Sequence, residues 1–139
     1  MNLKKKGKKT KLSTLKKKAW STLSLLTRLS ASDANGYCSC VTCGMTKHYK
    51  EMQAGHWVPQ AQGNAVRFDR RNVHVQCYRC NVNLGGNGPE YSAFMERTYG
   101  KEVMEELRRK SNESVKFTQA DYEQMISEWE SELQQLDAA

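Results

Sequence analysis

Four of the five cysteines stand in two pairs with the spacing of a metal site. The pairs are Cys40-Val-Thr-Cys43 and Cys77-Tyr-Arg-Cys80. Each pair can offer two thiolates from one tight turn, so two pairs together complete a tetrahedral zinc site of the closed, structural type. A redox Cys-x-x-Cys would not need a second pair, and buried free thiols are the remaining alternative. The spacing favours structural Zn²⁺ and a reducing, intracellular setting. Cys38 is left over, either by chance or as a competing ligand.

The segment between the pairs carries the residue types of a hydrolytic site. It holds His56 and Asn72, and Asn81 follows the second pair directly. A neutral imidazole can accept a proton from water while that water attacks phosphorus. A divalent cation can stabilise the charge on the phosphate and on the departing oxygen. These residues indicate phosphodiester hydrolysis, although His56 alone would equally suit a structural histidine or an additional zinc ligand.

Positive charge gathers at the start of the chain. Nine lysines and no acid fall within the first 18 residues, whereas six acids and no base fall within the last 21. This pattern predicts a polyanionic partner, most simply nucleic acid. A solvated basic tail and surface are the plainer alternative. The residues that we expect to contact phosphate are Lys4, Lys5, Lys6, Lys8, Lys9 and Lys11 near the N-terminus and Arg67, Arg70, Arg71 and Arg79 around His56.

The composition is polar for a chain that must build its own core. The apolar fraction is 38% and the mean hydropathy is −0.79, which favours a metal or a partner as a source of added stability. No apolar run reaches the roughly 18 residues of a membrane span, and no small-residue cleavage site follows the basic N-terminus. The sequence therefore predicts no membrane partner and no secretory signal.

The length fits one compact domain with extensions. We expect a basic flexible tail over residues 1–13, an N-terminal helix and loop over 14–36, a zinc-bound core over 37–89 and a helical region over 90–139. These regions must position the cysteines and the residues between them.

Local patterns place the elements within these regions. Apolar residues at helical spacing from Leu15 onward predict a helix that ends near Ser30. The segment Val73–Gln76 has the character of a short strand. The C-terminal helical region should break near Gly100, and Thr118 should open a final helix.

The order of the polar residues resembles that of the HNH, or ββα-metal, nucleases. In that family a β-hairpin carries a general-base histidine and leads into a helix whose start helps to hold the catalytic cation. By position His56 corresponds to the base, Asn72 to the middle asparagine that would orient the hairpin or the histidine, and Asn81 to the cation-binding end. The resemblance implies an α+β fold, with a small zinc-stabilised ββα-metal (HNH) core flanked by N- and C-terminal helices.

A narrower resemblance covers roughly residues 15–136 and is densest over 40–88. The sequence is similar to the lambdoid phage NinG family, also called Rap, of recombination endonucleases, through Cys40-Val-Thr-Cys43-Gly44, Ala54-Gly55-His56, Arg67-Phe68, Asn72-Val-His74-x-Gln76-Cys77-x-x-Cys80-Asn81 and Gly86-Asn87. The resemblance implies metal-dependent hydrolysis of branched DNA, such as Holliday junctions and D-loops, with Mg²⁺ or Mn²⁺ as the catalytic cation. It also implies a phage- or prophage-encoded protein in the cytoplasm of a bacterial host, and a two-fold-symmetric junction would suit a homodimer.

One position departs from the HNH pattern. Many HNH sites place a cation-binding aspartate directly before the base histidine, but here that residue is Gly55. Asn81 alone would hold a hard cation poorly, because Mg²⁺ prefers carboxylates. His74 lies two residues after Asn72 and so on the same face of an extended strand. We therefore expect His74 with Asn81 to bind the cation, with Asp69, the nearest carboxylate, as the second choice.

Two other functions fit parts of the pattern. A non-catalytic zinc-ribbon module that binds DNA or RNA would use the same cysteines and lysines, but it would not need His56 and Asn81 in register. Gly55 is the best argument for that module. A homing or restriction HNH enzyme would be expected to carry an additional base-reading domain. The sequence favours the structure-selective endonuclease.

Overall fold

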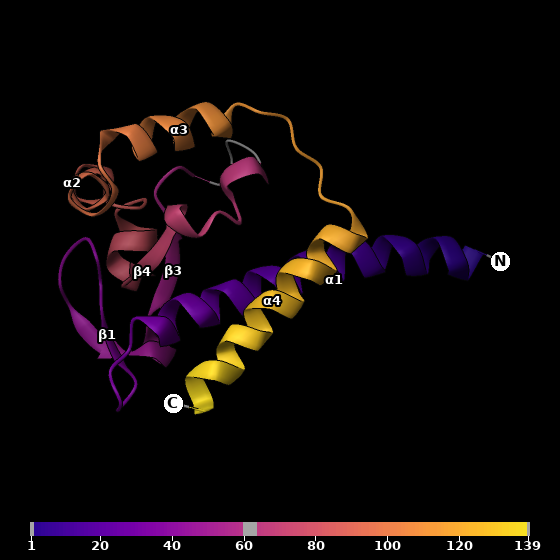
Figure 1. The fold of residues 1–139 in the computed structure, drawn as a ribbon, viewed down its shortest axis with the longest axis horizontal. Coiled ribbons are helices and arrows are strands. Elements are labelled where there is room, and N and C mark those ends of the chain that lie inside the picture. The colour runs from indigo at the N-terminus through magenta and orange to yellow at the C-terminus, as the bar shows by residue number, and fades with distance from the viewer. Residues whose placement is uncertain (1, 60–63, 139) are drawn as a thin grey trace. The chain divides into compact units, whose positions relative to one another are not determined.

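The computed structural model describes residues 2–59 and 64–138, and the side chains of 11–59 and 64–137. The chain falls into two compact units, one joining the described residues up to Leu26 to those from Lys116 onward, the other spanning Thr27–Val115. No helix in the described part of the chain has both the length and the apolar composition of a membrane span. The elements are α1 (Asn2–Ser30), β1 (Tyr37–Ser39), β2 (Thr46–His48), β3 (Gln53–His56), β4 (Val73–Gln76), α2 (Gly88–Tyr99), α3 (Lys101–Ser111) and α4 (Gln119–Ala138) (Figure 1).

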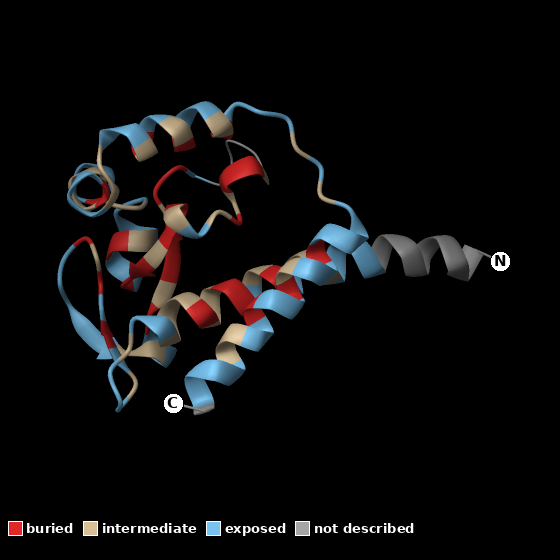
Figure 2. Cartoon of the chain, in the orientation of Figure 1, coloured by how far each residue is buried: buried red, intermediate tan, exposed pale blue. Residues whose placement is uncertain are grey.

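The first unit consists of α4 and most of α1. Thr118 opens α4 as predicted, because its backbone N–H donates to Asp121 Oδ2 at 2.8 Å while its Oγ1 accepts from the Asp121 N–H at 3.2 Å. This reciprocal pair satisfies donors that the first turn of a helix leaves open. The apolar residues of each helix are buried along one stripe (Figure 2), namely Ala19, Leu23 and Leu26 in α1 and Tyr122, Ile126 and Trp129 in α4.

The N-terminal helix is longer than the sequence predicted. Its end at Ser30 is confirmed, but α1 begins at Asn2, whereas the apolar spacing placed the start near Leu15. Lysine is a good helix former, so a helix can continue beyond its last apolar position. The flexibility of the tail over residues 1–13 stays a prediction.

The second unit contains two antiparallel hairpins, β1 with β2 and β3 with β4. In the β3–β4 hairpin Gly55 lies opposite His74, and His56 lies opposite Val73. Since side chains alternate along a strand, His56 and His74 lie on opposite faces of this hairpin. The predicted strand Val73–Gln76 is confirmed, and it leads into a short π-helical turn over Arg79–Asn83. The expected α+β class is confirmed at the level of helices, two small sheets and a cysteine cluster.

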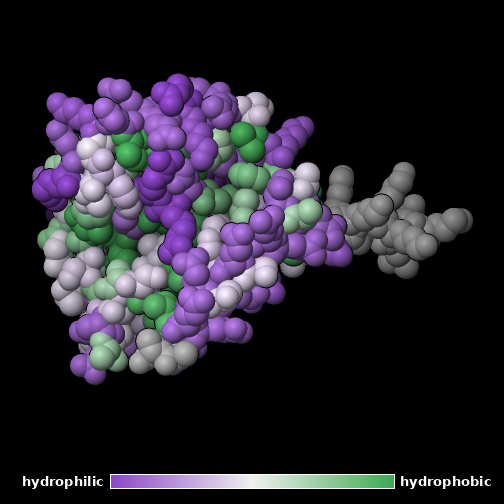
Figure 3. Space-filling view, in the orientation of Figure 1, coloured by the Kyte–Doolittle hydropathy of each residue, from purple (hydrophilic) through white to green (hydrophobic). Residues whose placement is uncertain are grey.

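Two hydrophobic clusters stabilise the second unit. The break between α2 and α3 falls at Gly100 as predicted, with a left-handed φ of 88° that favours glycine. These two helices contribute most of one cluster, while the outer face of α3 carries hydrophilic side chains (Figure 3). The first cluster comprises Trp57, Val58, Val66, Tyr91, Met95, Met104 and Leu107, and the second comprises Cys38, Cys40, Met52, Val75, Cys77 and Cys80.

Candidate functional site

The four paired cysteines meet at one point. The sulfur atoms of Cys40, Cys43, Cys77 and Cys80 all lie within 4.8 Å of one another, and Cys43 Sγ lies 3.7 Å from Cys77 Sγ. Four sulfurs bound to one tetrahedral zinc at about 2.3 Å lie about 3.8 Å apart. The cluster is therefore suited to hold a metal such as zinc. Cys38 is buried but stands outside this group.

The protonation of the cluster reflects the crowding of its thiols. Burial disfavours the Cys40 thiolate, but hydrogen bonds from Thr42 and from nearby backbone amides outweigh it and lower the pKa of Cys40 to about 6. A backbone hydrogen bond from Met45 favours the Cys43 thiolate, but burial and the neighbouring thiols raise the pKa of Cys43 to about 12. A bound cation would displace the remaining protons and allow all four sulfurs to ligate as thiolates.

The cysteine turns also hold the β3–β4 hairpin. The Val41 N–H, between the first two cysteines, donates to the Val75 carbonyl at 2.9 Å. Cys77 follows β4 directly, and Val75 packs in the same cluster as the sulfurs. A metal bound here would thus fix the strand that pairs with His56.

His56 ends β3 and is half-buried. Its Nε2 lies 2.9 Å from the carbonyl oxygen of Arg67. A carbonyl can only accept, so Nε2 carries the proton and Nδ1 carries the lone pair of the neutral ring. Burial lowers the pKa of His56 below its usual 6.5, which favours the neutral, basic form near neutral pH. The side chain has the chemistry that a general base requires.

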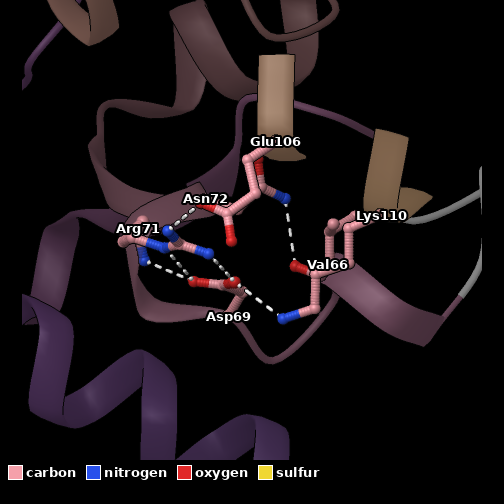
Figure 4. Close-up of polar contacts among 6 residues, drawn as sticks. All are labelled: Val66, Asp69, Arg71, Asn72, Glu106 and Lys110. Atoms are coloured by element: carbon pink, nitrogen blue, oxygen red, sulfur yellow. Dashed lines mark hydrogen bonds and ion pairs between the residues drawn. The ribbon is translucent and has the colours of Figure 1, made fainter. Parts of the chain in front are cut away.

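Asn72 is hydrogen-bonded to residues next to both His56 and Arg67. It is fully buried, and its Oδ1 accepts from the Val58 N–H at 2.8 Å. Its Nδ2 donates to the carbonyls of Val58 at 3.0 Å and Val66 at 3.1 Å, the latter drawn in Figure 4. Val58 lies two residues after His56, and Val66 directly precedes Arg67. The Asn72 side chain therefore links the segment that follows His56 to the segment that precedes Arg67.

His74 has an environment different from that of a cation ligand. Tyr91 OH donates to the Gly55 carbonyl at 2.8 Å, so His74 Nδ1, 3.0 Å away, is the donor to that hydroxyl. Its Nε2 then accepts from Tyr99 OH at 2.8 Å. Burial lowers the pKa of His74 to about 4. Both ring nitrogens of this neutral histidine are hydrogen-bonded to tyrosine hydroxyls. We therefore do not propose His74 as a ligand of the cation.

Asp69, the second choice, is held by two cations (Figure 4). Its carboxylate contacts Arg71 Nη2 at 2.9 Å and Lys110 Nζ at 3.0 Å. Burial alone would raise the pKa of Asp69, but the hydrogen bonds from Arg71 and Lys110 lower it below its usual value. Arg71 also pairs with Glu106 at 2.9 Å. Asp69 thus serves an ion-pair network between the segment before β4 and α3.

Asn81 lies beside Gly55, where the sequence placed the cation. Its Nδ2 donates to Gln53 Oε1 at 2.7 Å, and a Cβ added at Gly55 would lie 2.8 Å from its Oδ1. The sequence assigned no role to Gln76, yet this fully buried side chain also meets Gly55. The sequence held one signal for this contact. Gly55, on the strand paired with β4, has no side chain and therefore leaves room for a long neighbouring side chain such as that of Gln76.

The expected phosphate contacts differ in their exposure to solvent. Arg70 and Arg79 are exposed, Arg67 is half-buried, and Arg71 is engaged by two carboxylates. In the N-terminal segment Lys11 is exposed. The side chains of Lys4, Lys5, Lys6, Lys8 and Lys9 lie outside the described ones.

Comparison with known protein sequences places this chain in a family. The profile of the family described as "Bacteriophage Lambda NinG protein" matches residues 2–138. "Protein ninG" of Escherichia phage lambda is 30% identical over 95 residues, which cover 64% of this chain and 46% of the relative. "Protein ninG" of Enterobacteria phage H19B is 33% identical over 73 residues, which cover 52% of this chain and 36% of the relative. The chain spans less than half the length of these curated relatives. Among the solved structures there is no significant match.

Proposed function

This chain belongs to the NinG family of phage proteins, and we propose that it is a metal-dependent endonuclease that cleaves branched DNA, such as Holliday junctions and D-loops. The observation that carries the proposal is the hydrogen bond from His56 Nε2 to the Arg67 carbonyl. It gives a half-buried, neutral imidazole a basic Nδ1 at the end of a hairpin that leads into a short helix. A neutral imidazole suits a general base, and the resemblance to the HNH nucleases implies that role for His56.

The chain's own residues would perform the proton transfer. His56 Nδ1 takes a proton from a water molecule as the water oxygen bonds to phosphorus and the bond from phosphorus to the 3′ oxygen breaks. Asn72 keeps His56 and the Arg67 carbonyl in register through its bonds to Val58 and Val66. A divalent cation such as Mg²⁺ or Mn²⁺, when bound, supplies positive charge to the phosphate and the leaving oxygen. Asn81 Oδ1 is a hard oxygen donor that fits such a cation.

Zinc at the four cysteines would have a structural role. All four ligand positions are taken by protein sulfurs, so a bound Zn²⁺ has no open position for water or substrate. It would hold the hairpin by way of β4, which is followed directly by Cys77.

Basic residues outside the hairpin would supply affinity for DNA. The exposed Arg70 and Arg79 flank the motif, and the N-terminal lysines add charge without sequence preference. A homodimer would match a two-fold-symmetric junction. The preference for branched DNA rests on the NinG family resemblance.

A cleavage assay tests the proposal. Junction, flap and plain duplex DNA are incubated with the protein, with and without Mg²⁺ or Mn²⁺. Metal-dependent cleavage of branched DNA is expected for the wild type and for His48→Ala, a matched control because His48 lies on β2 outside the site. His56→Ala should lose cleavage but keep its affinity for DNA, since the base acts on water rather than on the ground-state complex.

The opposite outcome has a definite meaning. Binding of DNA without cleavage, unchanged by His56→Ala, would make the chain a zinc-ribbon nucleic-acid-binding module. Equal loss of binding and cleavage in His56→Ala would make His56 a structural residue.

A further inference from the structure

Two buried side-chain polar atoms of the described residues in the second unit have no hydrogen-bond partner, Arg67 Nε and Gln76 Oε1. Gln76 is fully buried at the end of β4. Its Nε2 donates to Thr42 Oγ1 at 3.1 Å and to the Gly86 carbonyl at 2.9 Å. Because the Gly86 carbonyl only accepts, the amide cannot be turned round. Gln76 Oε1 is therefore fixed in place, and it is buried without a partner.

This oxygen faces Gly55. A Cβ built at residue 55 would overlap Gln76 Oε1 and would lie 2.8 Å from Asn81 Oδ1. Two amide oxygens thus converge on the space that a side chain at residue 55 would fill. The backbone of Gly55 has no left-handed φ, so what the glycine provides here is room rather than an unusual conformation.

The Asn81 amide is also hydrogen-bonded, in this case to another side-chain amide. Its Nδ2 donates to Gln53 Oε1 at 2.7 Å, so its Oδ1 is turned toward Gly55 and Gln76. Gln76 Oε1 is a buried acceptor without a donor, which is rare because buried polar atoms are almost always satisfied, whereas Asn81 is half-buried. A cation would satisfy both oxygens at once.

We propose that Gln76 Oε1 and Asn81 Oδ1 together bind the divalent cation of the site, with Gln76 taking the place of the carboxylate that Gly55 cannot supply. This inference rests on the proposed function for the role of the cation. Amide oxygens are hard, neutral ligands. The phosphate of bound DNA would add the negative charge that they lack, so the cation should bind more tightly once DNA is present.

The other candidate ligands nearby are already used. His74 shares the hairpin face with Gln76, but both of its nitrogens contact tyrosine hydroxyls. Asp69 is paired with Arg71 and Lys110. A buried water that donates to Gln76 Oε1 is the competing explanation, and it predicts no dependence of cation binding on Gln76.

Binding of Mn²⁺ decides between these explanations. Free Mn²⁺ is measured by electron paramagnetic resonance with junction DNA present, in a cleavage-deficient His56→Ala background. Gln76→Leu, which keeps the volume but removes the amide, should weaken Mn²⁺ binding by about tenfold or more. Gln124→Leu on α4 is the matched control and should leave it unchanged. Zinc content and thermal unfolding show whether each variant is folded.

A second variant distinguishes the loss of a cation ligand from damage to the fold. Gly55→Asp with Gln76→Ala removes the overlapping amide and places a carboxylate at the same point. It should restore Mn²⁺ binding, a gain that damage to the fold cannot produce. Unchanged Mn²⁺ binding in folded Gln76→Leu, or no binding in the double variant, would overturn the cation site.

Cleavage by the wild-type protein separates this inference from the proposed function. Mn²⁺ binding that depends on Gln76 in a protein that cleaves no DNA would support the cation site and refute the nuclease. Cleavage of branched DNA by the wild type, together with a Mn²⁺ affinity that does not change in Gln76→Leu, would refute the cation site and support the nuclease.

Discussion

The carbonyl oxygen of Arg67 lies 2.9 Å from Nε2 of His56 and determines which nitrogen of the imidazole is basic. The contact depends on Asn72, whose buried amide bonds Val58 on one side and Val66 on the other. A main-chain carbonyl does not titrate, so this orientation of His56 persists across the pH range in which the imidazole itself changes charge.

The first prediction concerns the pH dependence of cleavage. The general base must be neutral, and burial lowers the pKa of His56 below 6.5. The rate should therefore be constant at higher pH and fall by about tenfold per pH unit once the pH is below that lowered pKa. Single-turnover rates at saturating DNA, from about pH 5 to about pH 8, measure the midpoint. Zinc content at each pH is the control, and a midpoint above 6.5 would contradict His56 as the base.

The second prediction concerns Asn72. Asn72→Ala leaves one buried N–H and two buried carbonyls without their partner, so it should lower the free energy of unfolding by about 2–4 kcal/mol. In protein that remains folded, cleavage at saturating DNA should fall by about tenfold or more, because His56 loses its register. Denaturant unfolding and single-turnover cleavage measure the two effects. Asn35→Ala, in an exposed loop, is the control, and wild-type cleavage by Asn72→Ala would contradict a positioning role.

The third prediction concerns the cysteine cluster. The purified, reduced protein should hold about one zinc per chain, and Cys77→Ser should abolish both zinc binding and stable folding. Cys38→Ser should keep the zinc, because Cys38 stands outside the cluster, at a cost of about 1 kcal/mol for a buried hydroxyl. Metal analysis and thermal unfolding measure these effects. A folded, reduced protein without zinc would refute the metal centre.

The sequence predicted those parts of the site that depend on spacing. The two Cys-x-x-Cys pairs, the strand at Val73–Gln76 and the break at Gly100 all follow from local patterns, and the structure confirms them. Asn72 is assigned a positioning role through the resemblance to the HNH pattern, and this role stays a prediction.

The sequence could not predict how side chains pair across the fold. The two nitrogens of His74 contact the hydroxyls of Tyr91 and Tyr99, which are distant in sequence. Asp69 is paired with Lys110 on α3, and the Gln76 side chain lies against Gly55 on the other strand of the hairpin. Each of these environments is set by tertiary contacts that no local spacing reports.

The fourth prediction concerns stability in acid. The pKa of His74 is lowered from 6.5 to about 4, so the unfolded chain binds more protons than the folded chain between these values. The contribution of His74 is thus full above pH 6.5 and is lost as the pH falls to about 4, by about 2–3 kcal/mol. His74→Phe should remove this part of the pH dependence of unfolding, whereas His48→Ala should not. An identical pH dependence in wild type and His74→Phe would contradict it.

The fifth prediction concerns the N-terminal lysines. Deleting residues 1–11 removes six lysines but leaves the buried α1 residues Ala19, Leu23 and Leu26 in place. Each phosphate contact contributes about −0.9 to the slope of log K against log salt on duplex DNA. The deletion should therefore flatten that slope by several units, as measured by titration of labelled DNA at a series of salt concentrations.

The same deletion should not affect the cleavage step. His56, Asn72 and Asn81 all belong to the unit that spans Thr27–Val115, so cleavage at saturating DNA should survive. Affinity for plain duplex and for branched DNA should fall together, because charges on one short segment neutralise phosphates without reading the shape of a junction. The double variant Arg70→Ala, Arg79→Ala provides the comparison, since these exposed arginines flank the motif. An unchanged salt slope after the deletion, with a flattened slope in the arginine variant, would assign the phosphate contacts to the arginines and leave the lysine segment solvated.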